Sequence, residues 1–114
     1  MRLAIRDICS FAITQEDGQV VFDRITPALQ RREAVDLDFE GVTVYAAPFF
    51  NAAIGQLLRD FKREDLGALL KTENLTENGR EVVRQVLDNS EKYYASPDYR
   101  ATQRRVLEAM AEEM

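Results

Sequence analysis

The feature that most constrains the fold is a short segment in which apolar and acidic side chains alternate. Val35, Leu37 and Phe39 are separated by Asp36 and Asp38. Because successive side chains of a strand point to opposite faces, this pattern predicts a strand with one apolar and one polar face. A single strand is not stable by itself, so the pattern requires neighbouring strands and a layer that covers the apolar face.

A helical pattern follows this strand after a short gap. Its apolar positions recur at the three- and four-residue spacings of an amphipathic helix. Proline is favoured at the first position of a helix, so we expect this helix to begin at Pro48 and to run to residue 61. The apolar positions are Phe50, Ile54, Leu57, Leu58 and Phe61.

The same two periodicities predict the other elements and therefore the fold class. Strands are expected at 3–8, 34–39, 42–46 and 71–75, and helices at 15–30, 48–61 and 76–95, with a short helical turn at 64–70. The segment 42–46 is expected to form a tight hairpin with the preceding strand or to continue that strand after a jog. This order predicts an α/β fold with a mixed four-stranded sheet and helices packed mainly on one face. We expect one domain, residues 1–95, followed by an appended C-terminal helix, residues 96–114.

Within this framework, we expect a specific set of apolar side chains to form the core, since each lies on the apolar face of its predicted element. They are Val35, Leu37, Phe39, Ile54, Leu57, Val83, Val86 and Leu87.

Composition excludes several classes of function. The 114 residues include no His and one Cys, which excludes His-dependent catalysis, most zinc sites and an intrachain disulfide. A net charge of −5 disfavours non-specific nucleic-acid binding. No apolar run approaches the roughly 18 residues of a membrane span, and charges appear too early for a signal peptide. We therefore expect a cytoplasmic protein with no cofactor and no nucleic-acid or membrane partner.

The two acidic residues of the central strand allow two interpretations. Paired carboxylates on one strand face can bind a metal or act as acid and base. The other interpretation is a solvent-facing sheet surface, or a salt bridge to Arg2 or Arg6 on a neighbouring strand. An enzyme or small-ligand-binding protein that uses Asp36, Asp38 and Asn51 is therefore an alternative function.

The order of these motifs resembles STAS-like domains. The resemblance is carried by the segment from Val35 to Val42, by a helix with Asn51 and Gly55, and by Asn74-Leu75 before a long helix. Over residues 2–95 the chain is similar to small bacterial STAS-like proteins of unknown function. These are distantly similar to anti-sigma-factor antagonists and to the cytoplasmic domains of sulfate transporters. The resemblance implies a non-catalytic, regulatory protein-binding module.

It also implies a partner and a switch. In antagonists of this kind, a Ser lies where the second β run enters its helix. A partner kinase of the histidine-kinase-like ATPase fold phosphorylates that Ser, and the added charge ends binding. In this chain the corresponding stretch is Ala46-Ala47-Pro48, which has no hydroxyl, and the nearest hydroxyls belong to Thr43 and Tyr45. We therefore expect no phosphorylation at the helix start.

The same junction is the candidate partner-binding site. Ala47 offers no side chain that could cap the helix, so the N–H groups of Phe49 and Phe50 would face outward and could receive a carboxylate or phosphate. Alternatively, water satisfies these groups and both rings lie in the core. We expect Phe50 in the core and Phe49 at least partly at the surface. The candidate residues are Tyr45, Ala46, Ala47, Pro48, Phe49 and Asn51.

The last predicted helix provides a third interpretation. Tyr99, Val106, Met110 and Met114 form a narrow apolar stripe, too thin for a deep core but wide enough to contact one surface. That surface would belong to the chain's own domain, to a second copy or to a partner. A homo-oligomeric structural protein, such as a homodimer joined through residues 96–114, is therefore a further alternative.

Overall fold

Three short parallel strands form the sheet in the computed structural model, which describes residues 1–96. They are β1 (Arg2–Ala4), β2 (Val35–Asp38) and β3 (Leu70–Glu73), and their order in the sheet is β1-β2-β3. Leu3 pairs with Leu37, which in turn pairs with Thr72. Consecutive strands are therefore neighbours, and each connection between them is a helical crossover.

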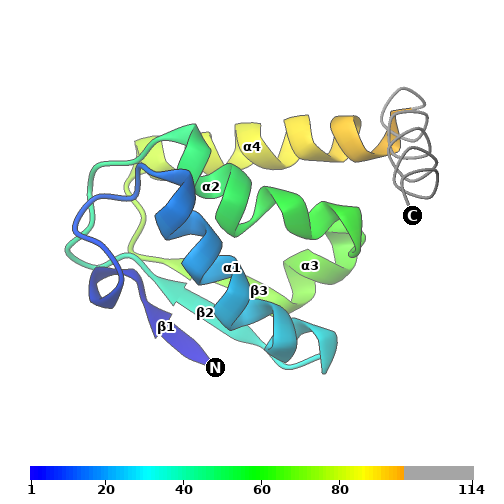
Figure 1. The fold of residues 1–114 in the computed structure, drawn as a ribbon, viewed down its shortest axis with the longest axis horizontal. Coiled ribbons are helices and arrows are strands. Elements are labelled where there is room, and N and C mark those ends of the chain that lie inside the picture. Colours follow the sequence, from blue (N-terminus) through cyan, green and yellow to red (C-terminus); the bar gives the residue numbers. More distant parts are fainter. Residues whose placement is uncertain (97–114) are drawn as a thin grey trace, which may run out of the picture.

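The helices cover one face of this sheet (Figure 1). Crossovers between parallel strands are right-handed as a rule, so a strand order that advances in one direction places both connections on the same face. α4 follows β3 and packs on α2 and on the 3-10 segment Gly55–Arg59 that follows α2. The helices are α1 (Gln15–Gln30), α2 (Ala47–Ala53), α3 (Arg63–Leu69) and α4 (Glu77–Ala95), with 3-10 segments at Ile5–Asp7 and Gly55–Arg59.

Two threonines set the starts of the two long helices. The Thr14 hydroxyl accepts a hydrogen bond from the Asp17 N–H at 3.2 Å, and the Thr76 hydroxyl accepts one from the Gly79 N–H at 3.1 Å. Each satisfies a backbone donor that has no partner within the helix. The predicted helices 15–30 and 76–95 are confirmed to within one residue at each end.

Alternation along the strands separates the core from a charged face. Val35 and Leu37 are fully buried on the helix side, while Arg2, Asp36 and Lys71 share a row on the other face. Most of the predicted core is confirmed, but Val83 and Leu87 are only half-buried. The confirmed members are Val35, Leu37, Phe39, Ile54, Leu57 and Val86.

The predicted four-stranded mixed sheet is not confirmed, because the described residues form three strands, all parallel. The expected fourth strand, 42–46, leaves the sheet instead. Gly41 adopts a φ of 80° in a turn that the Val42 N–H closes by donating to the Phe39 carbonyl at 2.9 Å. Gly tolerates this backbone conformation without a steric penalty, and the turn directs the chain away from the neighbouring strands.

Two predicted elements are shorter than expected. The strand at 3–8 ends at Ala4, after which the Ile8 N–H donates to the Ile5 carbonyl in a 3-10 turn. The helix at 48–61 is interrupted at Ile54, and residues 55–59 continue with 3-10 hydrogen bonds. Gly55 explains the interruption, because glycine has a low helix propensity and its missing side chain admits α4, where a Cβ would lie 2.6 Å from the Ser90 hydroxyl.

The short helical turn predicted at 64–70 and the strand predicted at 71–75 correspond to α3 and β3. The predicted C-terminal helix, 96–114, lies outside the described residues apart from Ser96, and so does its apolar stripe. The domain boundary after residue 95 stays a prediction.

Asp38 joins the ends of all three strands. Its carboxylate accepts hydrogen bonds from the Asn74 side-chain amide at 2.8 Å, the Glu40 N–H at 3.0 Å and the Arg2 guanidinium at 3.1 Å. Arg2 also donates to Glu73 at 2.6 Å. The hydrogen bond from Asn74, then that from Glu40, and then the Arg2 charge hold the pKa of Asp38 below its usual value. The predicted salt bridge to Arg2 is thus confirmed.

The backbones of α1 and α2 touch at Gly18. A Cβ at this position would lie 2.2 Å from the Phe49 carbonyl oxygen and 2.9 Å from the Ala52 Cβ. Only glycine permits this approach, since the nearest atom belongs to a backbone that cannot rotate away.

We expect Gly18→Ala to lower the free energy of unfolding by about 1–3 kcal/mol, because the added methyl group forces α1 and α2 apart. Gly67→Ala is the matched control, since a Cβ there has no atom within 4 Å. This control should leave stability unchanged or raise it by up to about 1 kcal/mol through helix propensity. Urea unfolding followed by circular dichroism measures both, and equal effects would contradict the proposed contact.

We expect Asp38→Asn to reduce the dependence of stability on acid pH. A carboxyl group whose pKa is lowered by folding stabilises the fold above its unfolded pKa, and this contribution is lost as the pH falls through the folded pKa. The wild type should therefore lose stability below about pH 4, while the variant, less stable at neutral pH, should lose less. Urea midpoints at pH 7, 4 and 3 test this expectation.

Asp36→Asn is the control for that experiment. Asp36 lies on the same strand, but its carboxylate makes none of the side-chain hydrogen bonds found within residues 1–96. The Asp36→Asn variant keeps the three hydrogen bonds of Asp38, so it should keep the loss of stability in acid that these bonds produce. An Asp38→Asn profile parallel to the wild type would show that this carboxylate does not link the strand ends energetically.

Candidate functional site

The segment that leaves β2 runs beside the segment that precedes α1. The Ala12 N–H donates to the Val44 carbonyl at 3.0 Å, and the Ala46 N–H donates to the Ala12 carbonyl at 2.9 Å. These bonds form an isolated parallel bridge between Ala12 and Tyr45. The two loops that lead into α1 and α2 are therefore fixed to each other by main-chain hydrogen bonds.

Side chains alternate about this bridge as they do in a sheet. Ala12 is fully buried and Tyr45 is half-buried. Their neighbours must point to the opposite side, toward solvent. Phe11, Ile13 and Val44 are accordingly 57%, 40% and 44% exposed.

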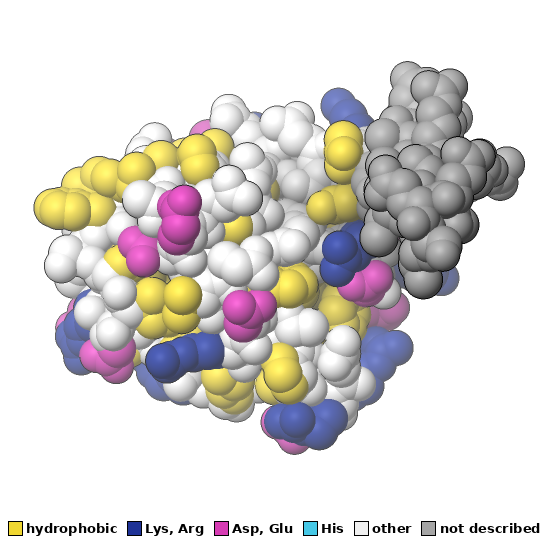
Figure 2. Space-filling model, viewed as in Figure 1, with side chains coloured by type: hydrophobic (Ala, Val, Ile, Leu, Met, Phe, Trp, Pro, Cys, Tyr) yellow, Lys and Arg dark blue, Asp and Glu magenta, His cyan; other side chains and the backbone are white. Residues whose placement is uncertain are grey.

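These side chains form an apolar patch with the first turn of α2. Ala47 and Pro48 are exposed there, directly after the bridge. Figure 2 shows hydrophobic side chains gathered over the loops at the end of the molecule where α1 and α2 begin. Contiguous exposed apolar surface marks an interaction site more often than single exposed residues do. We call this surface, made of Phe11, Ile13, Val44, Ala47 and Pro48, the Phe11 patch.

Sequence reasoning found Ala47 and Pro48 but missed the three large side chains of the patch. Val44 belongs to the segment 42–46, for which the sequence predicts a fourth strand of the sheet. Phe11, Ala12 and Ile13 form an uninterrupted apolar run between Ser10 and Thr14, so the sequence has no apolar–polar alternation that would distinguish the exposed side chains from the buried one. The exposure of Phe11 and Ile13 follows from the bridge between Ala12 and Tyr45, which local sequence patterns do not reveal.

Tyr45 supports the patch from inside. Its hydroxyl donates to the Val42 carbonyl at 2.6 Å, and its ring centroid lies 6.0 Å from that of Phe39 and 5.9 Å from that of Phe50. Because the ring and the hydroxyl are both engaged, this candidate residue fixes the loop rather than offering a free side chain to a partner.

The expectation that Phe49 lies partly at the surface is wrong, because its side chain is fully buried, as is that of Phe50. α2 is covered on two sides. The Phe49 ring meets Phe39 and Phe50 in edge-on contacts, with centroids 6.4 and 5.2 Å away, while its backbone lies against Gly18 of α1. Two adjacent aromatic residues can both be buried in this sandwich although they project in different directions.

The start of α2 also differs from the anion site that was one of the two interpretations of this junction. Ala46, the residue before the helix, provides no side-chain cap, as predicted for an alanine. However, the Phe49 N–H donates to the Ala46 carbonyl at 3.2 Å instead of facing outward. The patch therefore offers apolar contact rather than a group of free N–H donors.

The alternative site of Asp36, Asp38 and Asn51 is not brought together. The two acidic residues lie on β2, and the strand register places them on the face away from the helices. Asn51 lies on α2 and lines a hollow of about 360 Å³ with Gln15, Gln19 and Gln56. The Gln56 amide in this hollow already donates to Gln19 and to the Ala52 carbonyl.

Other chemical groups near the patch offer little reactivity. Burial raises the pKa of the Cys9 thiol, and the Asp17 carboxylate raises it further, which reduces the thiolate fraction.

Within residues 1–96, no three acidic or thiol side chains are grouped in a way that could hold a metal ion. In the same part of the chain, none of the helices has the length and apolar character needed to cross a bilayer.

Comparison with known families agrees with this architecture. The model of the family described as STAS-like domain of unknown function (DUF4325) matches residues 17–80, a range from the first turn of α1 to the first turn of α4. Searches of curated proteins and of solved structures gave no match. The family match covers more than half of the 114 residues and includes the segment that carries Val44, Ala47 and Pro48. The chain therefore belongs to this family of STAS-like domains.

Proposed function

We propose that this chain is a non-catalytic protein-binding module of a regulatory pathway and that its partner docks on the Phe11 patch. The observation that carries the proposal is the exposure of Phe11, Ile13 and Val44 on one side of a hydrogen-bonded loop pair. The main-chain hydrogen bonds hold these loops in place before a partner binds. Binding therefore costs less conformational entropy than it would if the loops were flexible.

The partner that fits best is an ATPase of the histidine-kinase-like fold. Support comes from the membership in a STAS-like family and from the resemblance to anti-sigma-factor antagonists. In those proteins the partner kinase phosphorylates a Ser at the start of the corresponding helix, and the Phe11 patch includes the first turn of α2. A partner segment with exposed apolar side chains would bury Phe11 at the centre of such an interface.

Binding at this surface would not be controlled by phosphorylation of a Ser at the helix start, as it is in anti-sigma-factor antagonists. Ala46, Ala47 and Pro48 have no hydroxyl, and the Tyr45 hydroxyl is hydrogen-bonded inside the domain. The module would then bind constitutively, or its binding would follow the concentration of its partner.

Substitution of the patch tests the proposal directly. We expect Phe11→Asp and Val44→Asp each to weaken binding to a co-encoded histidine-kinase-like ATPase at least tenfold, because a charge in an apolar interface must lose its hydration. Val20→Asp is the matched control, since Val20 is also 40% exposed but lies on α1 outside the patch. Isothermal titration calorimetry measures affinity, and thermal melting verifies that all three variants fold.

Wild-type affinity in Phe11→Asp, or an equal loss in Val20→Asp, would rule out the patch as the docking surface. Light scattering of the wild type and Phe11→Asp identifies self-association. A dimer that dissociates in the variant would show that the patch serves a second copy of the chain.

Phosphorylation provides a second test. After incubation with the same ATPase and ATP, we expect peptide mass spectrometry to find no phosphate on residues 45–51, because this stretch has Tyr45 as its single hydroxyl and that group is engaged. A phosphate on the exposed Thr43 or on Tyr45 would show that the switch has moved along the chain instead of being absent, and would contradict constitutive binding.

A further inference from the structure

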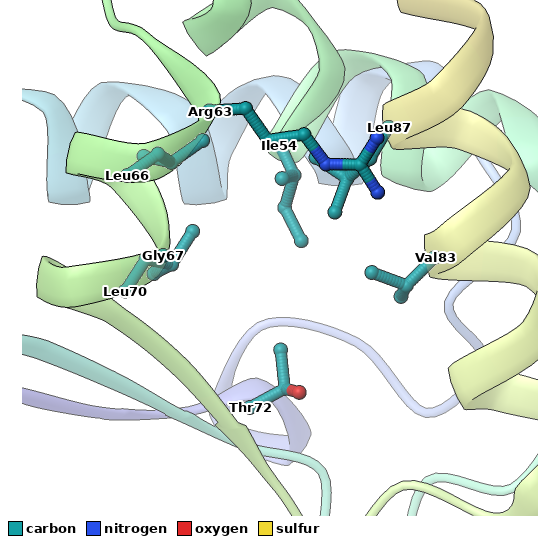
Figure 3. Close-up of a pocket in the computed structure, with 8 residues that line it drawn as sticks. All are labelled: Ile54, Arg63, Leu66, Gly67, Leu70, Thr72, Val83 and Leu87. Carbon is teal, nitrogen blue, oxygen red and sulfur yellow. The ribbon is translucent and has the colours of Figure 1, made fainter.

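A pocket of about 220 Å³ lies between α3, β3 and α4, and none of its lining residues belongs to the Phe11 patch. Figure 3 shows its side chains arranged around an open centre, with α3 on one side, α4 on the other and β3 below. The lining residues are Ile54, Arg63, Leu66, Gly67, Leu70, Thr72, Val83 and Leu87.

The wall of this pocket is aliphatic. Five of the eight lining residues are Ile, Leu or Val. Val83 and Leu87 occupy positions on α4 whose spacing predicts core residues, yet they remain half-buried because the pocket separates them from α3. A ligand that fills the pocket would remove this apolar surface from water, which is favourable in proportion to the area covered.

One polar group on the floor has no partner in the described part of the chain. The strand register places Thr72 on the helix side of β3, beside Leu37. Its side chain rises from β3 into the pocket (Figure 3), and its hydroxyl takes part in none of the side-chain hydrogen bonds within residues 1–96. A hydroxyl can donate one hydrogen bond and accept two, so Thr72 can bind either a donor or an acceptor on a ligand.

The charged groups at the mouth already neutralise one another. The Arg63 guanidinium extends from α3 across the mouth toward α4 (Figure 3). It donates to Asp88 at 2.6 Å and lies 3.8 Å from Glu91. Asp88 is also paired with Arg84 at 3.0 Å, so two guanidinium groups and two carboxylates balance one another. An anionic ligand would have to compete with the carboxylates for Arg63, and a cationic ligand would have to compete with two guanidinium groups for the carboxylates.

We propose that this pocket binds a small neutral molecule with a compact apolar body and one hydrogen-bonding group that pairs with Thr72. The aliphatic wall selects the apolar body, the paired charges at the mouth disfavour ionic ligands, and the floor hydroxyl orients the polar end. The size agrees with this class, because an engineered apolar cavity of about 150 Å³ in another protein binds benzene. Medium-chain alcohols and phenols represent the class.

The full-length wild-type protein can be tested with three probes of equal chain length. We expect 1-hexanol to bind more tightly than hexanoate and hexylamine by about tenfold, since only the alcohol enters without a charge. Methyl NMR titrations measure affinity and locate the site together. The shifted methyl signals should be those of the aliphatic lining residues, Ile54, Leu66, Leu70, Val83 and Leu87.

Two substitutions separate the apolar and polar contributions. Thr72→Val keeps the shape of the side chain and should weaken 1-hexanol binding roughly three- to tenfold while leaving toluene binding within about twofold. Val83→Phe should fill the pocket and abolish the binding of both probes. Val20→Phe makes the same change at an exposed position away from the pocket and should bind both probes like the wild type.

Several results would overturn the proposal. Hexanoate binding as tight as that of 1-hexanol would identify an anion site at Arg63 instead. Shifts spread over methyl groups outside the lining would show non-specific partitioning. Unchanged 1-hexanol affinity in Thr72→Val would remove the assigned role of the hydroxyl. If Val83→Phe does not fold, the wild-type methyl shifts and the Thr72→Val series decide the outcome.

Discussion

The backbone of α1 lies against the backbone of α2 at Gly18, and the enclosure of Phe49 depends on this contact. The missing side chain allows the Phe49 carbonyl to approach to a distance that any Cβ would forbid. With α1 on one side and Phe39, which directly follows the central strand β2, on the other, both Phe49 and Phe50 are enclosed. In an edge-on pair, the positive edge of one ring faces the negative face of the other, which stabilises the fold in addition to the burial of apolar area.

The same packing determines what the outside of the domain displays. Phe39 and Phe50 hold the Tyr45 ring, and Tyr45 fixes the loop that pairs with Ala12. Because Tyr45 and Ala12 point inward, the residues beside them point outward. The exposed apolar side chains at this end of the molecule are thus a consequence of core packing as well as of the local sequence.

The sequence was informative where one element determined the pattern by itself. The strand around Val35, the helices capped by Thr14 and Thr76 and the salt bridge of Asp38 follow from local periodicity and simple pairing rules. The burial of Phe49 could not be predicted in this way, because it requires two elements that come from distant parts of the chain. The separation of 42–46 from the sheet likewise depends on a turn whose direction the sequence does not specify.

The candidate site was predicted in part for the same reason. The junction before α2 could be located from Pro48, but Phe11 and Ile13 lie more than thirty residues earlier in the sequence. The main-chain bonds between Ala12, Val44 and Ala46, which local patterns do not reveal, bring the two segments together. Local patterns therefore identified one half of a surface whose other half depends on tertiary contacts.

The two outer strands also affect how the protein behaves at high concentration. β1 and β3 each pair on one side only within the described residues, which leaves backbone donors and acceptors free at both edges of the sheet. Exposed edges can template aggregation, but these are three and four residues long and carry Arg2, Lys71 and Glu73. Short strands and charged side chains at the edges both disfavour the addition of a further strand, so this sheet carries two of the features that limit edge-to-edge association.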